Sequence, residues 1–68
     1  MTLKMKTWLH EHGLTATAIM RAAGIWNTHD FYRMLNGRKK VPPELRETLC
    51  GVYGMTDQEL REVLPWTA

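Results

Sequence analysis

The sequence has only one cysteine, Cys50, among its 68 residues. A single cysteine cannot form an internal disulfide, so nothing in the sequence marks an oxidising compartment. Long apolar runs are also missing. No run approaches the roughly 18 residues of a membrane span, and the opening MTLKMK lacks the apolar segment of a signal peptide. We therefore expect a soluble, cytoplasmic protein.

Recognisable motifs for catalysis and metal binding are absent as well. No glycine motif of the kind that cradles phosphate occurs. His10 and His12 lie two residues apart, which points them to different faces of a helix, and no cysteine or acidic cluster completes a ligand set. Cys50 lacks a convincing histidine partner and is more typical of a small buried hydrophobic residue. We expect no enzyme activity, metal, cofactor or small-molecule ligand.

The composition that remains is that of one globular domain. Hydrophobic residues make up 44% and charged residues 24%, which is too apolar for a disordered tail. A chain of this size buries only about 60% of its unfolded surface, so we expect a single domain over residues 1–68. The net charge is unevenly distributed, at +5 over residues 1–43 and −3 over residues 44–68. Such asymmetry suits a polyanion-facing half backed by a solvated or protein-facing half.

Glycines and prolines divide the chain into helix-sized segments. The sequence has no internal repeat and no convincing alternation of apolar and polar residues with a period of two. Good N-caps, a proline pair and a capping box mark the helix starts, and glycines or Pro65 mark the ends. We therefore expect an all-α fold of five helices. Their approximate ranges are 2–12, 15–23, 27–36, 41–54 and 56–64.

Apolar residues at helical spacing predict the side of each segment that faces the core. The expected inward residues are Leu3, Met5, Trp8, Leu9, Ile19, Met20, Ala23, Phe31, Met34, Leu35, Leu45, Leu49, Val52, Leu60, Val63 and Leu64.

The second and third segments, joined by a turn that contains Gly24, suggest a helix-turn-helix over about 15–36, whose second helix enters the DNA major groove. Opposite its apolar side, this helix presents an arc of polar groups: Thr28, His29, Tyr32, Arg33 and Asn36. Such side chains can bond base edges, thymine methyls or phosphates, and arginine can bond guanine through two hydrogen bonds. The alternative is an ordinary solvated face, because any surface helix collects polar residues.

Three consecutive cations, Arg38, Lys39 and Lys40, follow this helix. They are well placed to neutralise phosphates, which is the sequence-independent part of DNA affinity, although a solvated loop would look the same in isolation. Thr15 and the free amides at the start of the second helix offer another phosphate site.

With these segments in place, the sequence resembles the Cro/cI-type helix-turn-helix family of phage and bacterial repressors, also described as lambda-repressor-like or XRE-type domains. The resemblance covers nearly the whole chain. It rests on Leu14-Thr15, on Ile19 through Gly24-Ile25, on Phe31-Tyr32-Arg33-Met34-Leu35-Asn36-Gly37, on the basic loop and on Thr56-Asp57-Gln58-Glu59-Leu60. It implies a compact five-helix lambda-repressor-like domain that acts as a small transcriptional regulator in bacteria, encoded by the cell or by a phage.

The resemblance also implies that Thr28, His29 and Arg33 contact bases, and that Thr15 and the Asn36-Gly37 loop touch phosphates. Taken with the side-chain chemistry, the predicted base contacts are Thr28, His29, Tyr32 and Arg33. The predicted phosphate contacts are Thr15, Thr17, Asn27, Asn36, Arg38, Lys39 and Lys40. The expected partner is a double-stranded DNA operator, bound by a homodimer across half-sites one DNA turn apart. Trp66 and the C-terminal helix either form that interface or, in the case of Trp66, fold back onto the domain.

The sequence departs from the family pattern at three positions. Met20 stands where the family has a small alanine, Leu35 stands where it often has an acid, and the turn before Phe31 is longer by one residue. An alignment without this extra residue would bury Asp30 and expose Phe31, at a cost of several kcal/mol. We therefore predict the longer turn.

Trp26, inside that longer turn, has two interpretations. It fills the gap between the helices, or its indole contacts a phosphate or a partner. The second interpretation connects with a rival function, because a fold does not fix its function. In that rival, the chain is an antirepressor-like protein-interaction module that grips another protein through Trp26, Tyr32 and Arg33 and does not read DNA.

Overall fold

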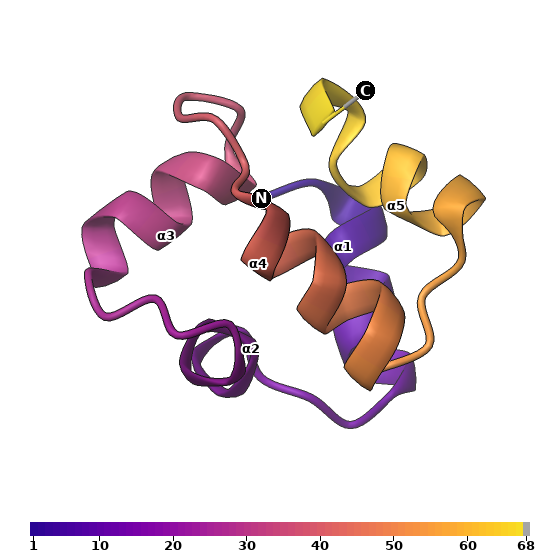
Figure 1. Cartoon of the computed structure of the whole chain (residues 1–68). Coiled ribbons are helices and arrows are strands. Elements are labelled where there is room, and N and C mark those ends of the chain that lie inside the picture. Colours follow the sequence, from indigo (N-terminus) through magenta and orange to yellow (C-terminus); the bar gives the residue numbers. More distant parts are fainter. Residues whose placement is uncertain (68) are drawn as a thin grey trace.

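The structure is a computed structural model that describes residues 1–67 of the chain, and over these residues it is all-helical (Figure 1). Five α-helices occur in this range, where the sequence predicts five. They are α1 (Leu3–Glu11), α2 (Ala16–Ala22), α3 (Thr28–Leu35), α4 (Pro43–Glu47) and α5 (Asp57–Val63). A π-helical segment, η1 (Thr48–Val52), continues α4, and a 3₁₀ turn, η2 (Pro65–Thr67), follows α5.

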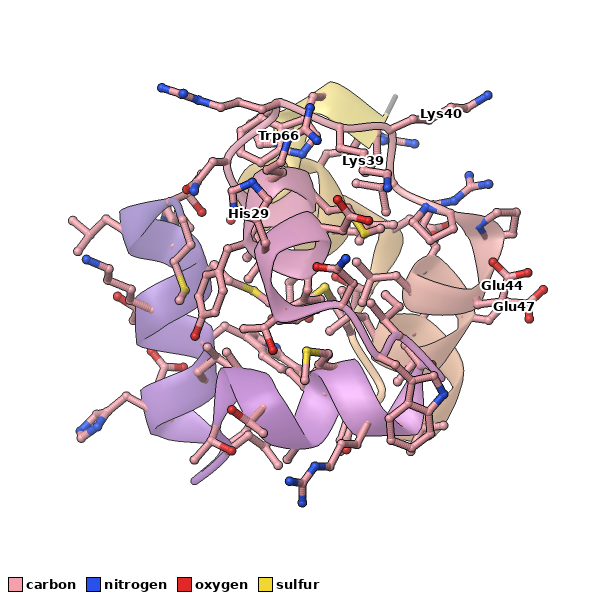
Figure 2. The ribbon with its side chains drawn as sticks, turned by 90° about the vertical axis from the view of Figure 1, so that its left-hand side faces the viewer. His29, Lys39, Lys40, Glu44, Glu47 and Trp66 are labelled. Carbon is pink, nitrogen blue, oxygen red and sulfur yellow. The ribbon has the colours of Figure 1, made fainter. Side chains whose placement is uncertain are left out.

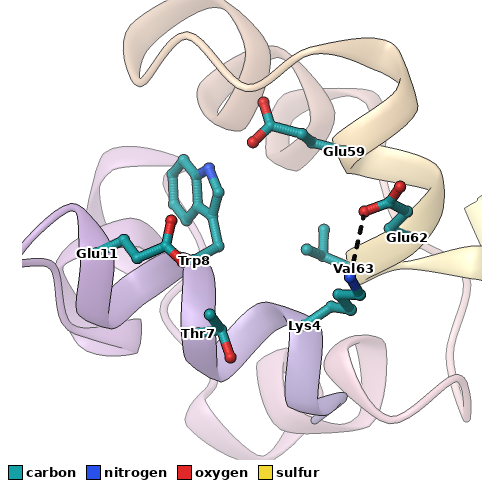
Figure 3. Close-up of a pocket in the computed structure, with 7 residues that line it drawn as sticks. All are labelled: Lys4, Thr7, Trp8, Glu11, Glu59, Glu62 and Val63. Atoms are coloured by element: carbon teal, nitrogen blue, oxygen red, sulfur yellow. Dashed lines mark ion pairs between the residues drawn. The ribbon is translucent and has the colours of Figure 1, made fainter.

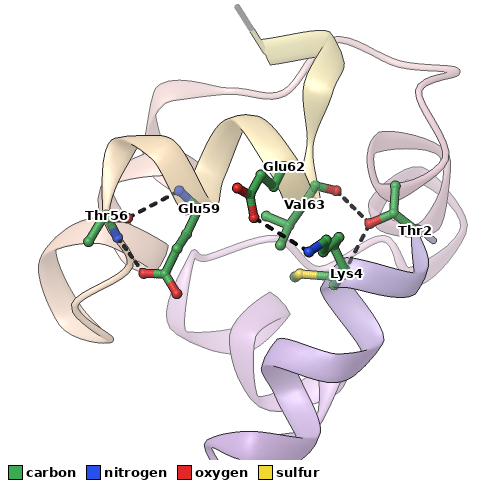
Figure 4. Close-up of polar contacts among 7 residues, drawn as sticks. Thr2, Lys4, Thr56, Glu59, Glu62 and Val63 are labelled. Atoms are coloured by element: carbon green, nitrogen blue, oxygen red, sulfur yellow. Dashed lines mark hydrogen bonds and ion pairs between the residues drawn. The ribbon is translucent and has the colours of Figure 1, made fainter.

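Side-chain caps start four of these helices where the sequence predicts them to start. Thr2, Thr15 and Asn27 each accept a hydrogen bond from the backbone N–H three residues on. Thr56 and Glu59 form a reciprocal capping box, with the Glu59 N–H donating to the Thr56 hydroxyl at 3.1 Å and the Thr56 N–H donating to Glu59 Oε1 at 3.0 Å (Figure 4). These contacts satisfy amides that a helix leaves without partners in its first turn.

The segment predicted as one regular helix over 41–54 is different in its second half. The Thr48 hydroxyl donates to the carbonyl of Glu44 at 2.8 Å, and the Tyr53 N–H reaches back five residues to Thr48 at 3.2 Å. The wider π-helical turn rotates the chain less per residue, so the side chains after it leave the predicted register. Val52 is 68% exposed, which corrects its predicted inward position, and Tyr53 packs against the core instead.

The core lies between the helices and contains most of the predicted apolar residues. Leu3 is the other exception, at 78% exposed. At about 100° per residue it lies opposite the buried side of its helix, so its prediction as an inward residue was wrong. The buried hydrophobic residues are Met5, Trp8, Leu9, Ile19, Met20, Phe31, Met34, Leu35, Val41, Leu45, Leu49, Met55, Leu60, Val63 and Leu64.

Two contacts tie distant parts of the chain together. The Thr2 hydroxyl donates to the carbonyl of Val63 at 2.8 Å, which joins the start of α1 to the end of α5 (Figure 4). The Trp66 indole N–H donates to the carbonyl of Met34 at 2.8 Å, and its ring lies against Gly37. The interpretation in which Trp66 folds back onto the domain is therefore confirmed.

Candidate nucleic-acid interface

The connection between α2 and α3 begins with a glycine-dependent helix end. Gly24 has a φ of +74°, its N–H donates to Arg21, and the Ile25 N–H donates to Met20 at 3.0 Å. This is the hydrogen-bond pattern of a Schellman motif, in which a left-handed residue ends the helix. The chain then turns into α3, which crosses α2 steeply. Figure 1 shows α2 end-on and α3 running across the view.

The longer turn before α3 buries Phe31, as predicted from the sequence. Phe31 is fully buried, and Asp30 stays at the surface. Ile25 packs against the core and occupies the inward position of the turn. Trp26, the next residue in an extended stretch, points outward and is 80% exposed. Of the two interpretations of Trp26, the one in which it fills the gap between the helices is therefore wrong.

All the predicted base-contacting residues lie on the exposed side of α3, opposite its buried residues. Figure 2 looks onto this side, with α3 facing the viewer, α2 below it and the loop after α3 above it. The exposed polar residues of α3 and its C-cap are Thr28, His29, Tyr32, Arg33 and Asn36. The Tyr32 ring also packs edge-on against Phe31, with 5.8 Å between the ring centroids, which restricts its orientation.

Several predicted phosphate contacts already have hydrogen-bond partners within the chain. Thr15 accepts from the Ala18 N–H, and Asn27 accepts from the Asp30 N–H, because each caps a helix. The side-chain carbonyl of Asn36 accepts from the amine of Met1. Since these contacts occupy oxygen acceptors, they leave the hydroxyl hydrogens and amide NH₂ groups that a phosphate would need. Thr17 is exposed on α2.

The basic loop folds back toward α3 through Asp30, an acid that was not predicted to belong to the site. Lys39 Nζ lies 2.8 Å from Asp30 Oδ2, and Arg33 Nη1 lies 3.7 Å from Asp30 Oδ1. The hydrogen bond from Lys39, together with the positive charges of Lys39 and Arg33, holds the pKa of the Asp30 carboxyl below its ordinary value. The structure therefore brings one predicted base contact and one predicted phosphate contact together around a carboxylate.

Arg38 and Lys40 are exposed on the same loop. Figure 2 shows the Lys40 side chain extending away from the domain, whereas Lys39 turns down toward α3. The loop and α3 thus form a continuous basic, hydrogen-bonding surface, which we call the α3 face. It consists of Thr28, His29, Tyr32, Arg33, Asn36, Arg38, Lys39 and Lys40.

Asp30 was missed as part of the site. The spacing of Asp30 and Arg33 by three residues could have revealed their pair, since such neighbours meet on a helix surface. The Asp30–Lys39 contact depends on the path of the loop, and the contact of Trp66 with Gly37 depends on η2. Neither leaves a local signal in the sequence.

Comparison of the chain with protein-family models, curated proteins and solved structures finds no match. Among residues 1–67, no group of three histidine, cysteine or acidic side chains is arranged to hold a metal ion. Each helix in this range is too short or too polar to cross a membrane. Cys50 is half-buried, and burial raises the pKa of its thiol, whereas a nucleophilic cysteine needs a lowered one.

Proposed function

We propose that this protein is a sequence-specific double-stranded DNA-binding domain of the helix-turn-helix kind, acting as a small transcriptional regulator. The observation that carries the proposal is the α3 face. The helix and its C-cap expose five side chains that can bond base edges or phosphates, and three cations follow in the adjoining loop. This combination supplies the two parts of DNA recognition, base contacts for specificity and phosphate contacts for affinity and register.

The arrangement of α2 and α3 supports the proposal. In a helix-turn-helix, the first helix crosses the DNA backbone and the second presents its outer side to the major groove. Here α2 is anchored through Ile19 and Met20, and α3 is anchored through Phe31, Met34 and Leu35. The helix that would read DNA therefore sits on a packed base, with its polar arc directed outward.

Asp30 gives the α3 face a built-in competitor for DNA. A phosphate approaching Lys39 must replace or share the carboxylate that holds this lysine in the free protein. Exposed ion pairs contribute little net free energy, because water screens them and ordering the side chains costs entropy. The exchange is therefore feasible, and a lysine already ordered over the helix is well placed for a phosphate beside the groove.

Selection of bound sites from a random DNA library, followed by titration of affinity against salt, tests the proposal. We expect one preferred sequence that binds at least about 1,000 times more tightly than random DNA, with affinity that falls steeply as salt rises. Half-site spacing in the selected sequences would also test the predicted homodimer. Absence of DNA binding at low salt would refute the proposal.

Arg33→Ala and Lys40→Ala form a matched pair for the two kinds of contact. Arg33→Ala should cost about 1–3 kcal/mol and relax the preference at one base pair. Lys40→Ala should weaken binding to all sequences alike and reduce the salt slope by about 0.9. Both follow from fluorescence anisotropy with the selected site and with single-base variants of it. Equal losses on every sequence for both variants would contradict a base-reading role for Arg33.

A protein-interaction module is the second candidate, and the exposure of Trp26 is the observation that favours it. Exposed tryptophans at a partner surface are often among the strongest contributors to binding. In this case, Trp26→Ala would abolish partner binding while the wild-type protein shows no selective DNA binding. Under our proposal, the selected DNA site exists and discriminates among sequences.

A further inference from the structure

A cavity of about 180 Å³ lies between α1 and α5 (Figure 3). Three carboxylates line it: Glu11 from α1, and Glu59 and Glu62 from α5. Lys4 is the one cation among its lining residues, and its Nζ lies 3.9 Å from Glu62 Oε2, with the lysine side chain 70% exposed. With three carboxylates against one lysine, the cavity carries a negative balance of charge.

Trp8 provides a second and independent observation in the same cavity. Its side chain is buried, with the residue only 4% exposed, and its indole Nε1 has no hydrogen-bond partner within residues 1–67. Figure 3 shows the nitrogen on the edge of the ring that turns toward α5. Other contacts fix this ring, because His12 stacks on it at 4.3 Å and Tyr53 meets it edge-on at 6.4 Å. A buried donor without an acceptor is costly, so an acceptor supplied from outside residues 1–67 would stabilise this position.

The cavity is large enough to admit a side chain, since its volume of about 180 Å³ is several times the roughly 30 Å³ of a water molecule in the liquid. A complementary occupant would offer an acceptor to Trp8 and positively charged donors to the glutamates. A protein segment that carries arginine offers both, through its backbone carbonyl and its guanidinium. The planar guanidinium has five N–H donors and matches carboxylates through paired hydrogen bonds.

The carboxylates are available for this contact. Glu59 uses Oε1 for its capping box, which leaves its second oxygen for another donor. The hydrogen bond from the Thr56 backbone holds the pKa of Glu59 below its ordinary value, so this carboxyl is ionised at neutral pH. Glu11 and Glu62 are exposed at the two sides of the cavity.

We propose that the cavity between α1 and α5 is a binding site for an arginine side chain of a basic protein partner. Glu11, Glu59 and Glu62 pair with the guanidinium, and the Trp8 indole N–H donates to a carbonyl of the same segment. Because α5 lies on the far side of the domain from α3, the partner and DNA would occupy different surfaces (Figure 1). The site stands independently of the proposed function.

Titration of the ¹⁵N-labelled protein with a tri-arginine peptide, acetylated and amidated at its ends, tests the proposal. The indole N–H signals in the NMR spectrum report on the three tryptophans, and Trp8→Phe identifies the signal of Trp8. We expect that signal to move as the peptide binds, and tri-glutamate to leave it unchanged. A Trp8 signal that exchanges with water but does not respond to the peptide would show hydration only and overturn the proposal.

Two double variants with equal net charge separate a specific site from general attraction. Glu11→Gln with Glu62→Gln removes two carboxylates from the cavity and should weaken peptide binding about tenfold. Glu44→Gln with Glu47→Gln removes two carboxylates from α4, which Figure 2 shows at its outer edge, and should leave binding unchanged. These surface changes keep the fold intact even if Trp8→Phe unfolds the domain. Equal weakening by both variants would show that the peptide senses net charge alone and would refute the site.

Discussion

The contact of Trp66 with Gly37 can be tested by adding one methyl group. An alanine Cβ at position 37 would lie 2.9 Å from Cε3 and 3.0 Å from Cδ2 of the Trp66 ring, where ordinary contacts begin at 3.4 Å. The ring would have to move by about half an ångström or more, which strains its hydrogen bond to Met34. Gly37 also has a φ of +75°, which an alanine adopts only at a cost.

The magnitude follows from these two effects. The left-handed backbone costs roughly 1–2 kcal/mol for an alanine, offset by about 0.4–1 kcal/mol because alanine restricts the unfolded chain. Displacing the indole adds the loss of one hydrogen bond and some packing, about 1–2 kcal/mol. We expect Gly37→Ala to destabilise the domain by about 2–3 kcal/mol.

Gly13→Ala is the matched control, since Gly13 has a φ of +63° and no atom within 4 Å of an added Cβ. It should show the backbone effect alone. Thermal unfolding followed by circular dichroism should place the Tm of Gly37→Ala roughly 5–15 °C below that of Gly13→Ala. Adding Trp66→Ala to both variants should remove most of this difference. Equal Tm values for the two single variants would refute the proposed packing of Trp66 on Gly37.

Asp30→Asn should strengthen binding to random DNA and steepen the salt slope by up to about 0.9, because it releases Lys39 and Arg33 from a competing carboxylate; unchanged anisotropy titrations would contradict this. The same variant should be less stable than the wild type at neutral pH. The difference in free energy of unfolding between the variant and the wild type should vanish as the pH falls through the lowered pKa of Asp30. A carboxyl whose pKa is lowered on folding stabilises the fold only while it is ionised. Urea unfolding at several pH values measures this, and a deficit that persists in acid would exclude the ion pair as its cause. Thr56→Ala should cost about 1 kcal/mol by removing the capping box, whereas Thr7→Ala, on the exposed side of α1, should change the urea midpoint little.

Local chemistry explains which parts of the fold could be predicted. The starts of α1, α2, α3 and α5 depend on caps within three residues, so Thr15 and Thr56 were recognisable from their neighbours. Burial of Phe31 followed from the cost of burying Asp30. The π-helical turn was not predictable, because Thr48 and its neighbours fit a regular helix equally well, and Val52 was misplaced for that reason.

Contacts between distant residues explain what was missed at the candidate site. The polar arc of α3 follows from helical spacing alone. The position of Lys39 over Asp30 depends on how the loop turns after Gly37. Two interpretations of Trp26 stayed open in the sequence, and the outward one holds because Ile25 occupies the inward position of the turn. The three-dimensional packing decides which of two neighbouring residues takes the inward position of a turn.

The end of α3 repeats the Schellman hydrogen bonds that end α2, with one difference. At the two positions whose side chains usually make an apolar contact across this motif, α2 has Met20 and Ile25, whereas α3 has Arg33 and Arg38. Two arginines cannot supply the apolar contact that a methionine and an isoleucine can make at these positions. The last turn of α3 should therefore open more often than that of α2, with faster amide hydrogen exchange, and an anion bound between the two arginines should slow it.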